Sequence, residues 1–398
     1  MILEEVILSA NTGADAIKRA PIVEEDTGVR CLRIGDVSQK REYSFWGFTK
    51  TSAQDYKRFK LDVNDLIVAR TGNSIGVNCL IEDEINSVFN NGLIRIKAKT
   101  DKILPRYLWY LVNSKSCQDY IQTIAYGTST QPNMKIKDFL KYSFRYQSLE
   151  EQRKIVHVID AFDKKIKANK QINENLSQQL RLIFQHTFLD EEHPEWPVEK
   201  LGSFLSLERG LSYKGKFLSD SEGVPMVNLG NILPNSVFRP EKLKFYTGEF
   251  KAKVIVKPGD IVVANTDLTQ AREVLGSAIF IPDLGYPTII CSHHISIVRD
   301  CRISKHFIHG MLNSPSYRER VIGFATGTTV LALPSETILN CEFALPPNEL
   351  IIEYDSIAES YYQKSEQLRK ENQQLLQLRD TLLPQLMSGQ LDVSEVSL

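Results

Sequence analysis

Apolar residues recur in alternating steps of four and three along two polar stretches of the chain that contain no glycine. In residues 150–188 the recurring positions are Ile155, Ile159, Phe162, Ile166, Asn169, Asn173, Leu176, Leu180 and Ile183. The second stretch has Ile351, Tyr354, Ala358, Tyr361, Ser365, Leu368, Asn372, Leu375, Arg379, Leu382 and Leu386. This heptad pattern predicts two helices that each bury one stripe of side chains. At 1.5 Å per residue each would be roughly 55 to 60 Å long, so we expect the two to pack on each other.

Asparagines interrupt both stripes. Antiparallel packing would bring Asn169 and Asn173 close to Asn372. Polar side chains at such positions fix helix register and orientation at some cost in stability. The alternative is that these amides are simply solvated, because the second stripe contains further polar residues. Pro384 and Gly389 are predicted to end the second helix.

The remaining sequence predicts a mixture of strands and helices. Short β-branched runs bounded by Gly, Pro, Asn and Asp are typical of strands joined by turns, as at residues 66–70, 92–98, 260–265 and 277–281. Helical spacing is found in residues 106–124 and 305–322. No βα unit recurs regularly enough to indicate a doubly wound sheet, so the predicted fold class is α+β.

The chain is also an internal repeat with an offset near 200 residues. Matches between its halves occur in one order throughout, which indicates two homologous units. The matched segments are 3–13 with 201–210, 33–38 with 228–233, 65–72 with 260–267, and 113–130 with 313–330.

Charge is distributed unevenly along the chain. The net charge is −1 and the pI about 6.7, which argues against a protein that simply coats phosphates. Residues 1–146 nevertheless carry a net charge of +4 and residues 191–347 one of −1, whereas residues 348–398 carry −5. The acidic C-terminal segment therefore offsets a basic first half.

The sequence also bears on location. The first ten residues contain acidic rather than basic side chains, and no apolar run approaches the roughly 20 residues that span a bilayer. The cysteines form no C-x-x-C pair, so we interpret them as small buried side chains in a reducing compartment. These features predict a cytoplasmic protein without a membrane segment.

Sequence motifs for catalysis are absent. The chain has neither an N/D-P-P-Y/F methyltransferase site, since residues 345–348 read LPPN, nor a G-x-x-x-x-G-K-S/T loop for nucleoside triphosphates. One group of potential metal ligands matches no zinc spacing, and no metal is predicted for it: Cys291, His293, His294, Cys301, His306 and His309.

Residues 149–176 and 368–393, including the sequence LRDTLLPQLMSG at 378–389, resemble the two spacer helices of the specificity subunits of type I restriction-modification systems. Together with the duplicated domains, the resemblance covers essentially the whole chain. It implies two tandem α/β target-recognition domains separated by two long helices that pack as an antiparallel coiled coil. The expected boundaries are 1–148 for the first domain, 149–190 for the first helix, 191–347 for the second domain, 348–389 for the second helix and 390–398 for a C-terminal tail.

If the halves are target-recognition domains, Lys and Arg would meet phosphates, and amide, hydroxyl and Arg groups on loops after matched strands would reach base edges. In the first domain the candidates are Arg70, Thr71, Asn73, Ser74, Asn90, Asn91, Thr128, Ser129, Thr130, Gln131 and Lys135. In the second they are Asn265, Thr266, Gln270, Ser292, His293, His294, Thr328 and Thr329. For each of these, a turn or capping role is the alternative. Because the loop sequences differ between the domains, we expect two different half-sites.

The resemblance further implies a non-catalytic chain that binds double-stranded DNA. The two helices would set the distance between the half-sites. Two methyltransferase subunits would supply S-adenosylmethionine chemistry, and motor-nuclease restriction subunits would use ATP and Mg²⁺. No cofactor is expected in this chain. Residues expected to contact the methyltransferase subunits are Arg153, Lys164, Lys167, Arg369 and Arg379.

Two other interpretations remain open. A coiled-coil scaffold whose paired domains bind proteins would account for the acidic pI and the long helices. A stand-alone enzyme is disfavoured by the missing motifs.

Overall fold

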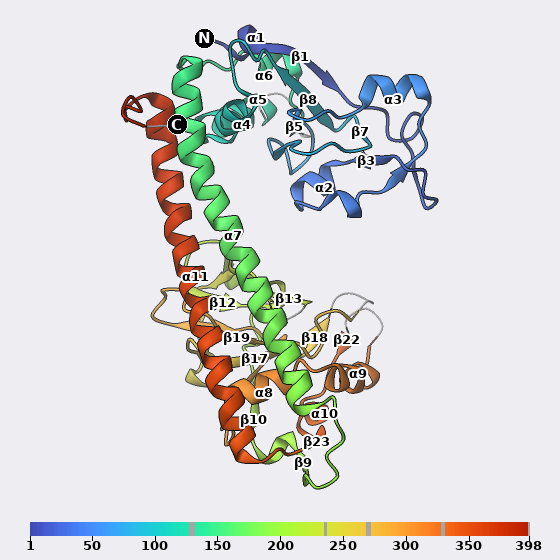
Figure 1. Ribbon diagram of the computed structural model, residues 1–398, viewed down its shortest axis with the longest axis vertical. Helices are drawn as coiled ribbons and strands as arrows, with labels where there is room; N and C mark the ends of the chain where they lie inside the picture. The colour runs from blue at the N-terminus through green and yellow to red at the C-terminus, as the bar shows by residue number, and fades with distance from the viewer. Residues whose placement is uncertain (127–131, 235–236, 268–271, 328–330, 397–398) are drawn as a thin grey trace. The chain divides into compact units, whose positions relative to one another are not determined.

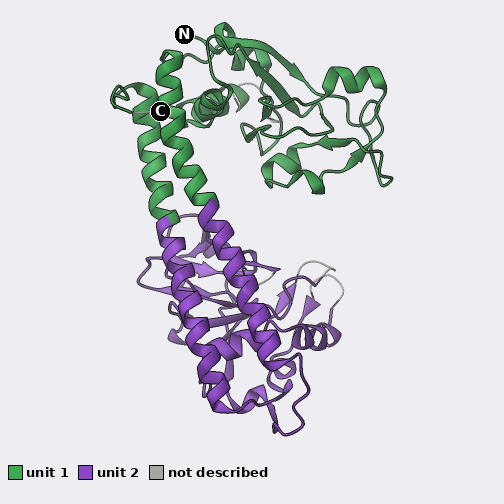
Figure 2. Cartoon of the chain, viewed as in Figure 1, with its two compact units in different colours: residues 1–167, 372–398 green, residues 168–371 purple. Residues whose placement is uncertain are grey.

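The computed structural model describes residues 1–126, 132–234, 237–267, 272–327 and 331–396. The chain forms two compact units (Figure 2), the first of residues 1–167 and 372–398 and the second of residues 168–371. Both ends of the chain therefore belong to the first unit. The boundary runs through the two long helices, so each unit contains a segment of each helix.

Two four-stranded sheets form the body of the first unit (Figure 1). One is antiparallel with the order β1-β8-β5-β6, and the other has the order β2-β4-β3-β7 with β3 and β7 parallel. The strands are β1 (Ile7–Thr12), β2 (Ile22–Val23), β3 (Arg30–Leu32), β4 (Phe48–Thr49), β5 (Leu66–Ala69), β6 (Asn78–Leu80), β7 (Ser87–Phe89) and β8 (Leu93–Ala98). The shorter helices are α1 (Leu3–Val6), α2 (Ile34–Ser38), η1 (Tyr43–Phe45), α3 (Ala53–Phe59), α4 (Pro105–Asn113), α5 (Lys115–Tyr126) and α6 (Ile136–Phe139).

The second unit contains a four-stranded sheet of order β10-β21-β17-β19 and a five-stranded sheet of order β11-β15-β12-β20-β16. Their strands are β10 (Ser206–Arg209), β11 (Leu218–Ser219), β12 (Val224–Val227), β15 (Lys244–Tyr246), β16 (Ile255–Val256), β17 (Ile261–Ala264), β19 (Ala278–Phe280), β20 (Ile289–Cys291) and β21 (Ile295–Arg299). Three two-stranded pairs are formed by β9 (Val198–Lys200) with β23 (Glu342–Ala344), β13 (Ile232–Leu233) with β14 (Val237–Phe238), and β18 (Thr266–Asp267) with β22 (Leu331–Ala332). The shorter helices are η2 (Leu201–Ser203), η3 (Gly215–Phe217), η4 (Leu229–Asn231), η6 (Pro240–Lys242), η7 (Ala252–Val254), α8 (Lys305–Met311), α9 (Pro315–Gly323) and α10 (Ser335–Leu339).

The sheet topology confirms the internal repeat. The order β1-β8-β5-β6 in the first unit recurs as β10-β21-β17-β19 in the second, and the parallel pair β3-β7 recurs as β12-β20. The central strands β5 and β17 are buried along their whole length. Alternate side chains point to opposite faces of a strand, and in β5 Leu66 and Val68 enter one core while Ile67 and Ala69 enter another. This two-sided burial explains why the strands are continuous apolar runs rather than alternating ones.

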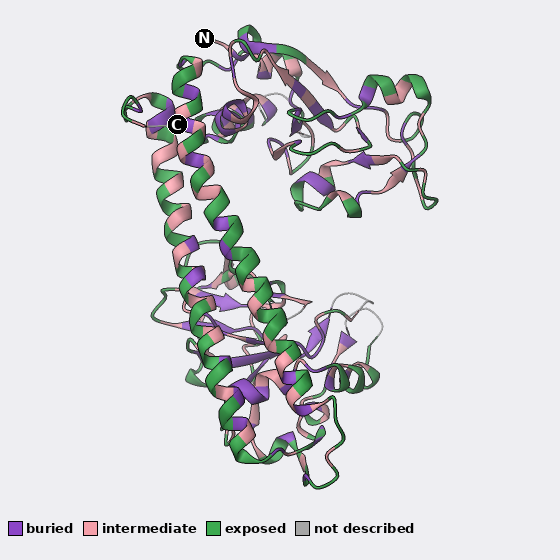
Figure 3. Ribbon diagram, viewed as in Figure 1, coloured by how far each residue is buried: buried purple, intermediate pink, exposed green. Residues whose placement is uncertain are grey.

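The two long helices are α7 (Leu149–Phe188) and α11 (Asn348–Ser388), which lie side by side in Figure 1. Every position of both predicted stripes is buried or half-buried, and the intervening positions are mostly exposed (Figure 3). In the first unit Arg379 of α11 pairs with Asp163 of α7 at 2.7 Å. In the second unit the hydroxyl of Tyr361 lies 3.4 Å from Oε1 of Gln179. Residues further along α7 contact residues earlier in α11, so the two helices run in opposite directions. The predicted antiparallel coiled coil is confirmed.

Asn169 is a fully buried member of the stripe, and its Nδ2 donates to Oε2 of Glu371 at 2.9 Å. Asn372, the next residue of α11, is also buried, and Asn173 is half-buried. The alternative that these amides are simply solvated therefore does not hold for Asn169 and Asn372. No described helix is long and apolar enough to cross a membrane.

The prediction that Pro384 ends the second helix is wrong. Pro384 lies inside α11, which continues to Ser388 and is followed by Gly389 with a φ of +69°. Proline removes one backbone donor from a helix, but the next turn carries Leu386 and Met387 into the core of the first unit. Burial of these side chains favours the additional turn, and the helix ends at the glycine.

An equivalent polar contact joins each sheet domain to the long helices. In the first unit Nε of Arg106, on α4, donates to Oδ1 of Asp160 on α7 at 2.9 Å. In the second unit Nε2 of His306, on α8, lies 2.7 Å from Oε2 of Glu359 on α11. The repeat therefore includes the helices as well as the sheets.

Candidate nucleic-acid interface

Three segments meet at the end of β5 in the first unit and are here called the first loop cluster: residues 70–74, 90–92 and 132–135. The backbone N–H of Arg70 donates to Gly92 O at 2.9 Å, and the N–H of Met134 donates to Arg70 O at 2.8 Å. Nη2 of Arg70 also donates to Oδ1 of Asn133 at 3.0 Å. The structure thus brings together Arg70, Thr71, Asn73, Ser74, Asn90, Asn91 and Lys135, which the sequence places far apart.

The second loop cluster consists of residues 265–267, 292–294 and 331–333 at the end of β17. Its main-chain hydrogen bonds repeat those of the first cluster. Asn265 N–H donates to His294 O at 3.0 Å, and Leu333 N–H donates to Asn265 O at 2.8 Å. The two clusters are therefore the same backbone frame at equivalent places of the repeat.

Two more hydrogen bonds complete the correspondence. Asn90 N–H donates to Leu32 O at 3.1 Å, as Ser292 N–H does to Val227 O at 2.9 Å. Asn91 and His293 likewise donate their N–H groups to the carbonyls of Ala14 and Leu211, each at 2.8 Å. Position by position, Arg70 corresponds to Asn265, Asn90 to Ser292, Asn91 to His293 and Gly92 to His294. The frame is shared and the side chains differ.

The first cluster presents polar groups to solvent. Asn73, Asn91 and Lys135 are exposed, and Arg70, Thr71, Ser74 and Asn90 are half-buried. Nε of Arg70 and Oδ1 of Asn90 are buried atoms without a hydrogen-bond partner in the structure. Because buried polar atoms in folded proteins are almost always paired, these two atoms suit a site that is completed by a ligand. Asn133, which Arg70 orients, was missed by the sequence analysis although it lies between predicted positions.

Three predicted residues of the second cluster are less accessible than their counterparts in the first. Asn265, Thr266 and Ser292 are all buried. Nδ2 of Asn265 donates to Oγ of Ser296 at 3.0 Å, and Oγ1 of Thr266 lies 2.9 Å from Nδ1 of His294. Oδ1 of Asn265 and Oγ of Ser292 are nevertheless buried atoms without a hydrogen-bond partner among the described residues, as are Nε of Arg70 and Oδ1 of Asn90 in the first cluster, so the reading role of these positions stays a prediction.

His293 and His294 are the half-buried polar side chains of the second cluster. Their ring centroids are 3.9 Å apart, and the ring of Tyr213 lies 5.4 Å from that of His293. Burial lowers the pKa of both imidazoles, assisted by the positive charge of Arg209. The lowered pKa favours the neutral form of both rings, and a neutral imidazole offers one donor and one acceptor.

Several predicted residues cannot be placed. Seven of them lie outside the described residues: Thr128, Ser129, Thr130, Gln131, Gln270, Thr328 and Thr329. Among the described residues no group of three or more His, Cys, Asp or Glu side chains could hold a metal ion. All six cysteines are free.

The residues expected to contact partner subunits divide into two sets. Arg153, Lys164 and Lys167 are exposed on α7. Arg369 instead pairs with Glu366 at 2.9 Å, and Arg379 bonds to Asp163 across the helix pair. Arg369 and Arg379 are half-buried in these intrachain ion pairs, and their contact with a partner subunit stays a prediction.

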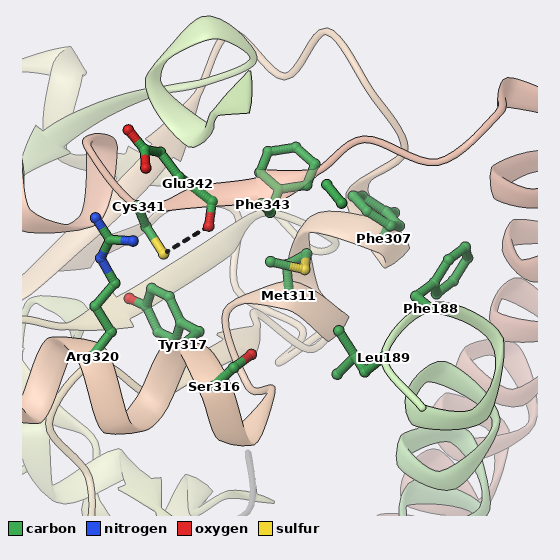
Figure 4. Close-up of a pocket in the computed structure, with 11 residues that line it drawn as sticks. Phe188, Leu189, Phe307, Met311, Ser316, Tyr317, Arg320, Cys341, Glu342 and Phe343 are labelled. Atoms are coloured by element: carbon green, nitrogen blue, oxygen red, sulfur yellow. Dashed lines mark hydrogen bonds between the residues drawn. The ribbon is translucent and has the colours of Figure 1, made fainter. Parts of the chain in front are cut away.

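Two cavities are found in the second unit, away from the loop clusters. One of about 240 Å³ is lined mainly by core side chains, with Arg320 and Glu342 at one side and Phe188 and Phe307 at the other (Figure 4). Another of about 460 Å³ lies between the C-terminal part of α7 and the α8–α9 connection. Neither contains a predicted base-reading residue.

Comparisons with known proteins match this architecture. Residues 10–178 match the family model of the type I restriction modification DNA specificity domain. The MjaIX specificity subunit of Methanocaldococcus jannaschii is 26% identical, over 77% of this chain and 73% of the relative. The HindI specificity subunit of Haemophilus influenzae is 23% identical, over 77% of this chain and 82% of the relative. The crystal structure of the specificity subunit from M. genitalium has the same fold, with a TM-score of 0.54, 17% identity and coverage of 97% of this chain and 95% of that one. Residues 10–178 thus resemble the type I restriction modification DNA specificity domain, and the chain is similar over about three quarters of its length to specificity subunits of type I restriction enzymes.

Proposed function

We propose that the chain reads a two-part DNA sequence on behalf of a type I restriction-modification complex, with one half read by each loop cluster. The observation that supports this most strongly is the repeated backbone frame with different side chains. Four main-chain hydrogen bonds recur in the two clusters, while Asn90 and Asn91 in one are replaced by Ser292 and His293 in the other. Two versions of one frame with different donors and acceptors suit two different half-sites.

The chemistry of the complex is assigned to partner subunits. The sequence contains neither a methyltransferase motif nor a nucleoside triphosphate loop. We infer that two methyltransferase subunits supply S-adenosylmethionine chemistry and that restriction subunits supply the ATP- and Mg²⁺-dependent steps. The duplicated chain offers equivalent surfaces to two identical partners. On α7, Arg153, Lys164 and Lys167 remain the candidates for that contact.

The test is to express this chain with a partner methyltransferase subunit and map methylated adenines in host DNA. A gapped two-part motif is expected. Exchanging residues 191–347 for those of a relative should change one half of the motif only. The substitutions Asn90→Ala with Asn91→Ala should relax the other half, since each lost base contact reduces discrimination by about 1–3 kcal/mol.

The pair His293→Ala and His294→Ala is the matched variant for the second cluster, and it should relax the half that the exchange altered. Methylation that does not depend on this chain would overturn the proposal. It would favour the scaffold interpretation, in which the paired domains bind proteins.

A further inference from the structure

Each loop cluster is bordered by a turn that the sequence analysis did not single out. Strand β1 of the first repeat and the equivalent strand β10 of the second are each followed by a glycine, Gly13 or Gly210. A Cβ atom on Gly13 would lie 2.2 Å from Phe89 O, and one on Gly210 would lie 2.2 Å from Ser292 O. The next residue then forms a parallel bridge with the cluster, Ala14 with Asn90 and Leu211 with Ser292. The segments that follow, residues 14–20 and 211–217, are here called the post-glycine turns.

The first post-glycine turn is held rigidly. Ala14 and Ala20 at its ends are fully buried. Oδ1 of Asp15 accepts the backbone N–H groups of Ile17 at 3.0 Å and Lys18 at 2.8 Å. The N–H of Ala20 donates to Asp15 O at 3.0 Å. These hydrogen bonds fix the conformation of a turn whose first residue, Ala14, is bonded to the first loop cluster.

The tip carries cations. Lys18 and Arg19 are exposed next to Ile17, which is 82% exposed. The guanidinium of Arg19 lies 3.8 Å from a carboxylate oxygen of Asp55. Exposed ion pairs of this kind contribute little and are screened by salt, so a phosphate can replace the carboxylate.

The second post-glycine turn has another sequence but the same character. Its exposed residues include Lys214 and Lys216. Phe217 N–H donates to Lys214 O at 3.0 Å, and Thr247 N–H donates to Phe217 O at 3.0 Å. Two cations thus recur at the same place of the repeat, although the second half of the chain has no excess of positive charge.

We propose that the post-glycine turns bind DNA backbone phosphates, through Lys18 and Arg19 in the first repeat and Lys214 and Lys216 in the second. The inference rests on the proposed function, because it assigns the phosphate contacts of the same DNA. Scattered surface lysines are common in proteins. Here, however, a hydrogen-bonded turn with two cations adjoins the predicted base-reading positions in both repeats, and this recurrence supports a role in DNA binding. Phosphate contacts fix the register of a protein on DNA, and base contacts give the sequence.

The test compares salt dependence of DNA binding. The chain, assembled with its methyltransferase subunits, is titrated with a duplex containing its methylation motif and with a scrambled duplex, at about 50 to 200 mM salt. Each lost phosphate contact reduces the slope of log affinity against log salt by about 1, so Lys18→Gln with Arg19→Gln should reduce it by about 2. The loss should be the same on both duplexes, and the methylated motif should not change.

The matched control is Lys99→Gln with Lys141→Gln, which removes two positive charges at the other end of β1, where Lys99 N–H bonds to Val6 O. The second-turn variant is Lys214→Gln with Lys216→Gln. The inference would be overturned if both turn variants gave the same slope of log affinity against log salt as this control. A changed motif would also overturn it, since the turns would then read bases. Absence of motif-specific binding by the unsubstituted complex would instead count against the proposed function itself. Melting temperatures equal to that of the unsubstituted chain are expected for both turn variants, because Lys18, Arg19, Lys214 and Lys216 are exposed.

Discussion

Gly13 and Gly210 show why single positions matter for the loop clusters. Both lie where two backbones come so close that a Cβ atom would overlap a carbonyl oxygen. Neither has a positive φ, so the requirement is for space and not for a left-handed backbone. The close approach is what joins each post-glycine turn to its cluster.

We expect Gly13→Ala to destabilise the first unit by about 1–3 kcal/mol, because the backbone must separate to admit the methyl group. Denaturant unfolding of the whole chain measures the loss. Gly35→Ala is the control: nothing lies within 4 Å of its Cβ position, and Gly35 is part of α2. A Gly13 variant as stable as the Gly35 variant would contradict this account of the contact.

For single residues, sequence patterns predicted where the loop positions lie better than what their side chains do. The alignment of the halves correctly paired Arg70 with Asn265, because strand length and loop position are visible in the sequence. It could not show that Asn265 and Ser292 are buried, since burial depends on β21 and β12, which are distant in the chain. Lys18 and Lys214 were missed for a related reason. Their turns share charge and position but no sequence motif.

The helix pair was the most predictable element. The heptad stripe depends only on the period of burial, and α7 and α11 bury that stripe as expected. Orientation required long-range information, which the buried Asn169–Glu371 contact provides. Pro384 does not end α11, because the local cost of the proline is smaller than the gain from burying the turn after it.

Asn169→Leu should change helix register more than stability. The substitution removes the hydrogen bond from Nδ2 to Glu371 but adds apolar surface at a buried position, so we expect a change within about 1 kcal/mol. Without the polar contact, neighbouring registers become closer in energy. Distances between spin labels at exposed positions 170 and 367 should therefore broaden or shift.

Gln171→Leu provides the control for the register experiment, because it adds the same side chain at an exposed position of α7. Its label distances should match those of the unsubstituted chain. An equally narrow and unshifted distribution for Asn169→Leu would show that the asparagine does not set the register.

Segments from both ends of the sequence together form the core of the first unit. The segment 390–398 was interpreted as a tail, but Val393 is buried in the core of the first unit, together with Leu386 and Met387 of α11. Nζ of Lys154 donates to Ser394 O at 2.7 Å, and Nε2 of Gln147 donates to Leu386 O at 2.8 Å. The core of the first unit is therefore completed by residues 386–394.

Deleting residues 372–398, at the boundary between the units, should consequently unfold the first unit and leave the second folded. The deletion removes Leu386, Met387 and Val393, and each buried side chain of this size contributes about 2–5 kcal/mol to a unit whose net stability is of the order of 5–15 kcal/mol. Hydrogen exchange should show faster exchange in residues 1–148 with protection retained in residues 191–347. Leu378→Ala, at a residue 48% exposed on the same helix segment, should leave both regions protected. Equal loss of protection in both regions after the deletion would mean that the chain unfolds cooperatively as a whole. Unchanged protection would mean that the C-terminal segment contributes nothing to the core of the first unit.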